Sequence, residues 1–187
     1  MTERPLPTPS QTIGPFYGHA LPFPDGGDIA PRNHPDTITV HGHVLDGAGA
    51  PVPDALLDFW QAAPDGSLTG TPGSLRRDPS TGGFLGRNGV DFTGFGRVPT
   101  DADGHYALHT LPPGNAGVPY ISVCVFARGL THHLFTRAYL ADGTDPLLDA
   151  LPAGRRATLI ADEETARTYR FDIRLQGEGE TVFLEFP

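Results

Sequence analysis

The chain has 187 residues and a formal net charge of −9, and 24 glycines and 20 prolines punctuate it. The acidic balance argues against a nucleic-acid-binding protein, which needs a basic face. The single cysteine, Cys124, excludes an internal disulfide and a zinc site built from several thiolates.

Targeting signals are the next feature that the sequence addresses. It contains no run of about eighteen apolar residues, which a membrane-spanning helix needs. The N-terminal residues MTERPLPTPS lack the apolar centre of a signal peptide. We therefore expect a cytoplasmic protein.

The first 36 residues are rich in proline and follow neither a strand nor a helix period. Such a segment gains little by folding alone, and its glycines and prolines suit close approach to a neighbour. We expect residues 1–36 to form an N-terminal arm and loop that docks on a partner chain. Residues 37–187 are expected to form one core domain.

The core domain alternates short β-branched or aromatic segments with turns, which is typical of an all-β protein. A short helix is expected over residues 145–151. Residues 64–99 have little periodicity, and we interpret them as a long functional or interface loop. The most economical architecture is a β-sandwich with long loops. Strands are expected over residues 37–46, 55–63, 104–111, 119–129 (apolar enough to be covered on both faces), 132–140, 156–163, 168–176 and 181–186.

Several segments resemble the intradiol ring-cleaving dioxygenase family, and within it the alpha-type subunits. The resemblance covers most of the chain, and it rests on residues 8–17 (TPSQTIGPFY), 40–66, 94–114, 125–129 (VFARG) and 132–143. Segment 94–114 as a whole is quite specific for the family, because it combines a turn, a strand and a Pro-Pro-Gly loop in a fixed order. The resemblance implies an antiparallel β-sandwich that takes part in cleaving protocatechuate (3,4-dihydroxybenzoate) with O2 between its two hydroxyl-bearing carbons.

The family holds Fe(III) with two tyrosinates and two histidines, a ligand set that suits a hard trivalent ion. At the matching positions this sequence has Ser67 or Leu68, Tyr120 and Ser122, and the loop 112–119 has no tyrosine. One phenolate at Tyr120 without the histidines is a poor ferric site. The resemblance thus implies an alpha–beta hetero-oligomer in which a homologous beta subunit binds the Fe(III), with no metal and no catalytic residue in this chain alone.

The alpha-type pattern implies that this chain completes the beta subunit's active site. The residues that match substrate-binding positions are Thr12, Gly14, Pro15, Phe16 and Arg128. A guanidinium stays charged and can bind the substrate carboxylate through paired hydrogen bonds. Gly14 and Pro15 can close one wall of the pocket and exclude water. The alternatives for Arg128 are contact through a water molecule or a salt bridge across the subunit interface.

Other motifs are weaker candidates. His41 and His43 share one face of a strand, a spacing that can chelate a metal, but no third ligand is evident and we interpret them as structural. Asp101 and Asp103 indicate a turn rather than a calcium loop.

The competing function is a non-catalytic β-sandwich for binding or assembly, with residues 64–99 as its recognition surface. A single-chain intradiol enzyme is disfavoured because the ligand set is incomplete.

Overall fold

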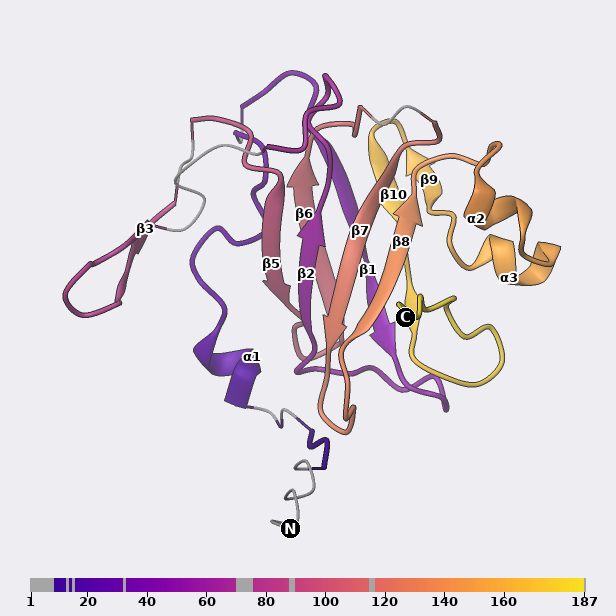
Figure 1. Ribbon diagram of the computed structural model, residues 1–187, viewed down its shortest axis with the longest axis horizontal. Coiled ribbons are helices and arrows are strands. Elements are labelled where there is room, and N and C mark those ends of the chain that lie inside the picture. Colours follow the sequence, from indigo (N-terminus) through magenta and orange to yellow (C-terminus); the bar gives the residue numbers. More distant parts are fainter. Residues whose placement is uncertain are drawn as a thin grey trace, which may run out of the picture.

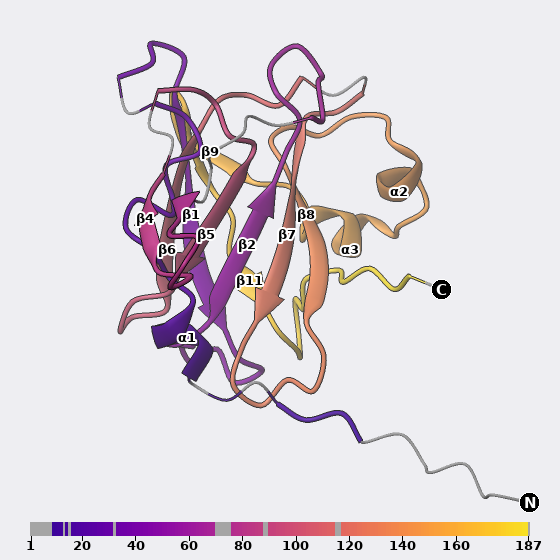
Figure 2. The same ribbon diagram turned by 60° about the vertical axis from the view of Figure 1, so that its left-hand side comes forward.

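Two large β-sheets packed face to face form the body of the molecule (Figures 1 and 2). This arrangement confirms the predicted all-β sandwich. The structure is a computed structural model, and it describes residues 9–12, 14, 16–31, 33–69, 76–87, 90–114 and 117–186.

The first sheet is built around strand β1 (Ile38–Leu45). This strand pairs antiparallel with β6 (His105–Thr110) and parallel with β10 (Thr168–Arg170) and β11 (Ile173–Arg174). Strand β9 (Asp162–Thr165) pairs with β10. Buried and half-buried side chains alternate along β1, as its period of two predicts. The sandwich is therefore mostly antiparallel, with two parallel pairs at β1.

The second sheet has the strand order β5-β2-β7-β8 and is antiparallel throughout. Its strands are β5 (Phe95–Pro99), β2 (Leu56–Trp60), β7 (Tyr120–Phe126) and β8 (Leu134–Tyr139). The predicted β7–β8 hairpin is confirmed. Side chains of β7 alternate between buried and half-buried, so the expectation that this strand is covered on both faces is wrong for this chain.

Strand β5 also corrects the interpretation of residues 64–99 as a loop. That segment contains β3 (Arg76–Arg77), β4 (Phe84–Gly86) and β5. Strand β5 includes a glycine, a poor strand former. It forms because its backbone pairs along the whole of β2, a contact between segments more than thirty residues apart.

The hydrophobic core lies between the two sheets. Val40 and Leu108 from the first sheet and Leu57 and Val123 from the second are all fully buried or nearly so. Complete burial of such an aliphatic side chain contributes roughly 1.5–3 kcal/mol. Because the core occupies the inward faces, the outward faces remain available for recognition.

Among the described residues, three short helices flank the sandwich: α1 (Phe16–Ala20), α2 (Pro146–Asp149) and α3 (Ala153–Ala157). The predicted helix is confirmed in α2, where Asp145 caps the first turn by accepting from the Leu147 and Leu148 amides. The strand expected over 156–163 is wrong in its first half, which ends helix α3. The strand expected over 181–186 is reduced to one isolated bridge, Leu184 to Phe135.

Part of the predicted arm packs on its own sandwich. Ile29 is fully buried in the core, and Asp28 bridges to His109 of β6. A Cβ added at Gly26 would lie 2.1 Å from the Arg97 carbonyl oxygen, so only glycine allows this approach. Docking of the segment on a partner chain stays a prediction.

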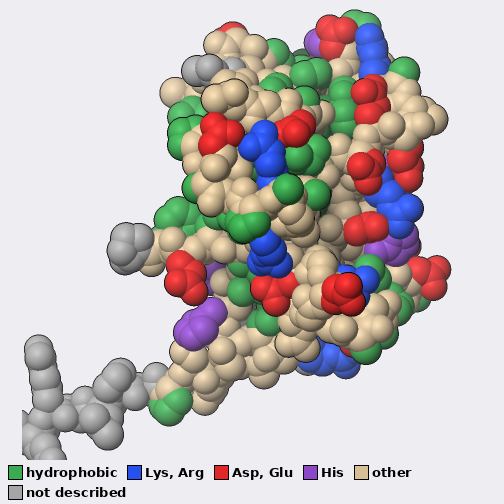
Figure 3. Space-filling view, turned by 90° about the vertical axis from the view of Figure 1, so that its right-hand side faces the viewer, with side chains coloured by type: hydrophobic (Ala, Val, Ile, Leu, Met, Phe, Trp, Pro, Cys, Tyr) green, Lys and Arg blue, Asp and Glu red, His purple; other side chains and the backbone are tan. Residues whose placement is uncertain are grey.

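The side of the molecule that carries α2 and α3 has interleaved acidic and basic side chains (Figure 3). Arg156 of α3 forms ion pairs there with Asp142 and Asp149. Within the described part of the chain, no helix has the length and hydropathy that a membrane span requires.

Candidate functional site

The part of the arm around Thr12 lies beside the connection between β7 and β8. The Gly129 amide donates a hydrogen bond to Thr12 Oγ1 at 2.9 Å, and the Gly14 amide approaches the same oxygen at 3.4 Å. Thr12 thus ties the arm to the residue that follows Arg128. Two segments that are far apart in the sequence, and that both carry predicted site residues, are neighbours in space.

Gly14 and Phe16 extend this site along the arm, and Pro15 lies outside the described residues. Gly14 has a φ of +66°, a left-handed conformation that favours glycine, although nothing lies within 4 Å of an added Cβ. Phe16 begins α1 and exposes 71% of its surface. An aromatic side chain left this exposed is available to a partner surface.

Arg128 contacts a residue that the sequence analysis missed. Its Nε lies 3.1 Å from Asp54 Oδ2, and 58% of the Arg128 side chain is exposed against 15% for Asp54. Such an exposed pair contributes at most about 1 kcal/mol to folding. The pair instead fixes the orientation of the Arg128 guanidinium, because it holds the Nε edge against the protein.

Asp54 also meets the arm. It stands in the turn before β2, and a Cβ added at Gly18 of α1 would lie 3.4 Å from its carbonyl oxygen. Its Oδ1 is buried without a hydrogen-bond partner among the described residues. In the sequence, Asp54 belongs to a Pro-Asp pair before a strand. That pattern is typical of an ordinary turn, so it did not mark Asp54 as a site residue. Thr12, Gly14, Arg128 and Asp54 therefore form one candidate site, which we call the arm site.

The positions that the resemblance assigns to iron ligands do not fit a ferric ion in this chain. Leu68 is exposed, and Ser67 Oγ is hydrogen-bonded to Thr69. The Tyr120 ring packs against Tyr139, with the Arg137 guanidinium carbon 4.2 Å from its centre. A cation over that ring disfavours a second, metal cation beside it. Among the described residues, no group of three or more His, Cys, Asp and Glu side chains could hold a metal ion.

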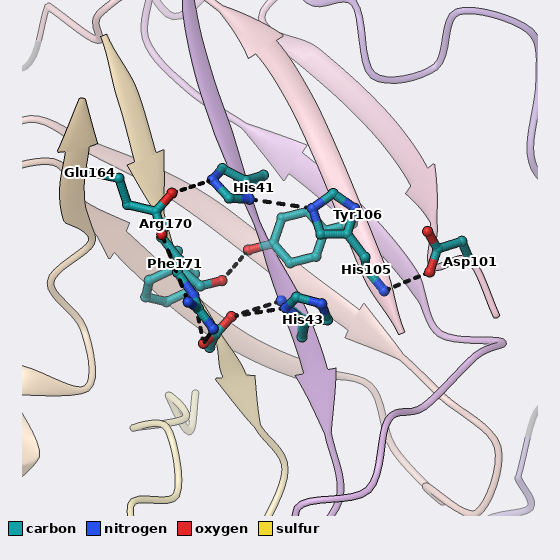
Figure 4. Close-up of polar contacts among 9 residues, drawn as sticks. His41, His43, Asp101, His105, Tyr106, Glu164, Arg170 and Phe171 are labelled. Atoms are coloured by element: carbon teal, nitrogen blue, oxygen red, sulfur yellow. Dashed lines mark hydrogen bonds and ion pairs between the residues drawn. The ribbon is translucent and has the colours of Figure 1, made fainter. Parts of the chain in front are cut away.

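The remaining histidine candidates lie in a polar network on the first sheet (Figure 4). His41 Nδ1 is 3.3 Å from His105 Nε2, and His41 Nε2 is 3.0 Å from Glu164 Oε2. His43 Nδ1 lies 3.5 Å from Asp172 Oδ1. These contacts link β1, β6 and β9, and they give the histidines partners within the protein.

Two further motifs lie in ordinary structural positions. Asp101 Oδ1 accepts hydrogen bonds from the Asp103 and His105 amides, which makes this segment a turn. Burial raises the pKa of the Cys124 thiol to about 12. A thiol with that pKa stays protonated at neutral pH and is a poor nucleophile.

Two large sheets packed face to face, with an arm tethered through Thr12, define a class of protein: a mostly antiparallel β-sandwich of the kind that the resemblance implies. A family model described as "Dioxygenase" matches residues 14–133. The protocatechuate 3,4-dioxygenase alpha chain of Burkholderia cepacia is 38% identical, over 95% of this chain and 96% of its own length. The chain therefore belongs to the intradiol ring-cleaving dioxygenase family.

Two more comparisons place it within that family. The beta chain of the Burkholderia cepacia enzyme is 31% identical, over 78% of this chain and 67% of its own. The dioxygenase domain of a carbohydrate-binding fusion protein from Streptomyces sp. SirexAA-E superposes with a TM-score of 0.59 at 28% identity, covering 91% of this chain and 99% of that one. The chain is thus a homologue of both subunit types and is more similar to the alpha chain.

Proposed function

We propose that this chain is the alpha subunit of a protocatechuate 3,4-dioxygenase and completes the active site of an iron-bearing beta subunit. The complex would cleave protocatechuate with O2 to 3-carboxy-cis,cis-muconate. One observation carries the proposal: Thr12 of the arm is hydrogen-bonded to Gly129, next to Arg128. This contact brings Thr12 of the arm next to the segment that carries Arg128. The similarity to alpha chains over nearly the full length supports the same assignment.

Arg128 would bind the carboxylate of the substrate. Asp54 holds the Nε edge of the guanidinium, and the exposure of the side chain leaves its terminal nitrogens accessible to a partner subunit. A guanidinium is always charged and matches the geometry of a carboxylate. Contact through a water molecule, or a salt bridge to the partner instead of the substrate, are the competing roles.

The arm would form one wall of the shared pocket. Gly14 and Phe16 lie where the arm leaves the Thr12 contact, and Pro15 between them belongs to the same predicted wall. A wall of this kind excludes water from the reacting groups and strengthens the electrostatic interactions inside. Fe(III) would be held by the beta subunit and would supply the chemistry that activates the substrate ring toward O2.

The test is to purify the chain alone and together with a beta chain, and then to measure iron content and ring cleavage of 3,4-dihydroxybenzoate. We expect iron and activity in the pair and neither in the lone chain. Stoichiometric iron and turnover in the lone chain would contradict the subunit assignment. A pair whose turnover is unchanged by removal of residues 1–16 would favour a role in assembly alone.

A further inference from the structure

Arg87 directly follows strand β4, at the base of a hairpin that projects from the sandwich (Figure 1), and the proposed function gives it no role. Its Nη1 donates hydrogen bonds to the carbonyl oxygens of Asp25 and Gly26, at 3.0 and 2.8 Å. Its Nη2 donates to Thr93 Oγ1 at 2.6 Å and to the Phe95 carbonyl. One half-buried guanidinium therefore joins the N-terminal arm to the start of β5. We call these contacts the base clasp.

Aromatic packing adds to the base clasp. The centres of the Phe23 and Phe84 rings lie 5.4 Å apart, and the Arg87 guanidinium carbon lies 5.7 Å from the centre of the Phe23 ring. A guanidinium over an aromatic face is attracted to it, and hydrogen bonds from a charged donor are stronger than those between neutral groups. The arm is therefore held firmly where it leaves the core.

The outer end of the arm is held more weakly. There the Gly129 amide donates to Thr12 Oγ1, and between this point and the base clasp the arm meets Asp54 through Gly18 of α1. A hydrogen bond between neutral groups at the surface contributes little by itself. A longer free segment also loses more entropy when its far end is fixed. Opening the base clasp lengthens the free segment that ends at Thr12, so the contact with Gly129 should form less often.

We propose that Arg87 is a positioning residue, and that the base clasp sets the path of the arm and so holds Thr12, Gly14 and α1 at the arm site. Arginine suits this role because its planar fork of donors reaches the arm on one side and β5 on the other. The effect on turnover rests on the proposed function, in which the arm forms a wall of the shared pocket. The effect on the contact between Thr12 and Gly129 does not, because both groups belong to this chain.

The Gly129 amide provides a readout far from Arg87 in the sequence. Hydrogen exchange of the full chain is followed by NMR, residue by residue. In Arg87→Gln, exchange should accelerate about fivefold at Gly129, which is the protection that one surface hydrogen bond gives. The Leu21 amide, which donates to the Tyr17 carbonyl at 3.1 Å, should follow. Amides within β7, which is paired on both sides, should keep the wild-type rate.

Arg77→Gln is the matched control. Arg77 lies in the same hairpin, but its Nη1 donates to the Gly82 carbonyl within that hairpin, so exchange at Gly129 should stay unchanged. Arg87→Lys keeps the charge without the fork and should restore only part of the protection. Thermal melting shows whether each variant is folded. Should Arg87→Gln not fold, Phe23→Leu removes the ring under the guanidinium and should accelerate exchange at Gly129 in the same way.

Turnover tests the consequence for the reaction. In the complex with a beta chain, Arg87→Gln should lower kcat for protocatechuate about tenfold, because a displaced wall misplaces the reacting groups. KM should change little, because Arg128 keeps its contact with Asp54. If the wild-type pair does not turn over protocatechuate, the proposed function fails, and exchange at Gly129 alone decides whether the base clasp positions the arm.

Three results would overturn the proposal. The first is unchanged exchange at Gly129 in folded Arg87→Gln. The second is an equal acceleration at Gly129 and within β7, which would show that Arg87 supports the sandwich as a whole. The third is an unchanged kcat in an assembled, active complex that carries Arg87→Gln.

Discussion

Arg128 and Arg137 lie near opposite ends of the β7–β8 hairpin, and their surroundings differ. Arg128 follows β7, is largely exposed and has a carboxylate, Asp54, at its Nε edge. Arg137 lies within β8, stacks on an aromatic ring and donates to a neutral hydroxyl. The first guanidinium is paired directly with an anion, whereas the second lies on an aromatic ring and donates to a hydroxyl that is itself hydrogen-bonded to the Asp145 carboxylate. One hairpin therefore holds its two arginines in different ways, one by a direct ion pair and the other through a ring and a hydroxyl.

The largest expected effect in this comparison is on turnover of the alpha–beta complex when Arg128 is removed. Arg128→Ala should lower kcat/KM for protocatechuate about 10²-fold, because a charged hydrogen bond to the substrate carboxylate is lost. A catechol without the carboxylate should be affected far less. Steady-state kinetics with both substrates measure the difference, and size-exclusion chromatography checks assembly. Failure of the complex to form would assign Arg128 to the interface instead.

The second prediction concerns the groups that hold Arg137. Asp145→Ala should lower the free energy of unfolding by about 2 kcal/mol, because it removes the cap of α2 and leaves the Tyr139 hydroxyl without its acceptor. Urea denaturation measures the change. Asp149→Asn is the matched control, since its exposed ion pair with Arg156 contributes little. Equal losses in the two variants would contradict a special role for Asp145.

Acid should separate a third variant, Asp145→Asn, from the wild type. Burial raises the pKa of the Asp145 carboxyl, but hydrogen bonds from Tyr139 and from the Leu147 and Leu148 amides outweigh it, and the pKa lies below its ordinary value. A lowered folded-state pKa stabilises the protein above the unfolded pKa, about 3.9, and that contribution is lost as pH falls through the folded value. Melting temperature between pH 6 and pH 2 should therefore drop less steeply in Asp145→Asn than in the wild type.

A smaller effect is expected from the carboxylate that orients Arg128. Asp54→Asn keeps the side-chain shape but removes the charge from the Nε edge. We expect kcat/KM for protocatechuate in the complex to fall about two- to fivefold, since an ion pair of this kind is worth at most about 1 kcal/mol. A fall of the same size with a catechol that has no carboxylate would argue against orientation of Arg128 and for a general structural effect.

The smallest expected effect is at the tether of the arm. Thr12→Val removes the oxygen that accepts from Gly129 and should cost about 1 kcal/mol of local stability. Proteolysis near the N-terminus should accelerate, while the melting temperature of the sandwich stays within error because the arm is not core. Thr12→Ser retains the hydroxyl and is the control. A lower melting temperature in Thr12→Val would show that the arm supports the sandwich itself.

The sequence predicted some elements well because their signals are local. Strands β1, β6 and β7 carry an alternation of period two, and α2 begins with an Asp-Pro cap. Strand β5 was missed because it carries a weak local preference and forms through pairing with β2. Helix α3 (Ala153–Ala157) was not predicted, and the strand expected over 156–163 overlaps its last two residues, because the helix lacks a cap side chain and a buried face of its own.

The arm signature and the absence of iron ligands at the expected positions are properties of residue identity alone, so the sequence by itself determined the family, the sandwich class and the residues proposed to act in trans. Only the tertiary structure decided which distant groups meet. It brought Thr12 to Gly129, set Asp54 against Arg128, and stacked Arg137 on the Tyr120 ring. Those contacts depend on strand pairing and burial between segments far apart in the chain, which no local pattern encodes.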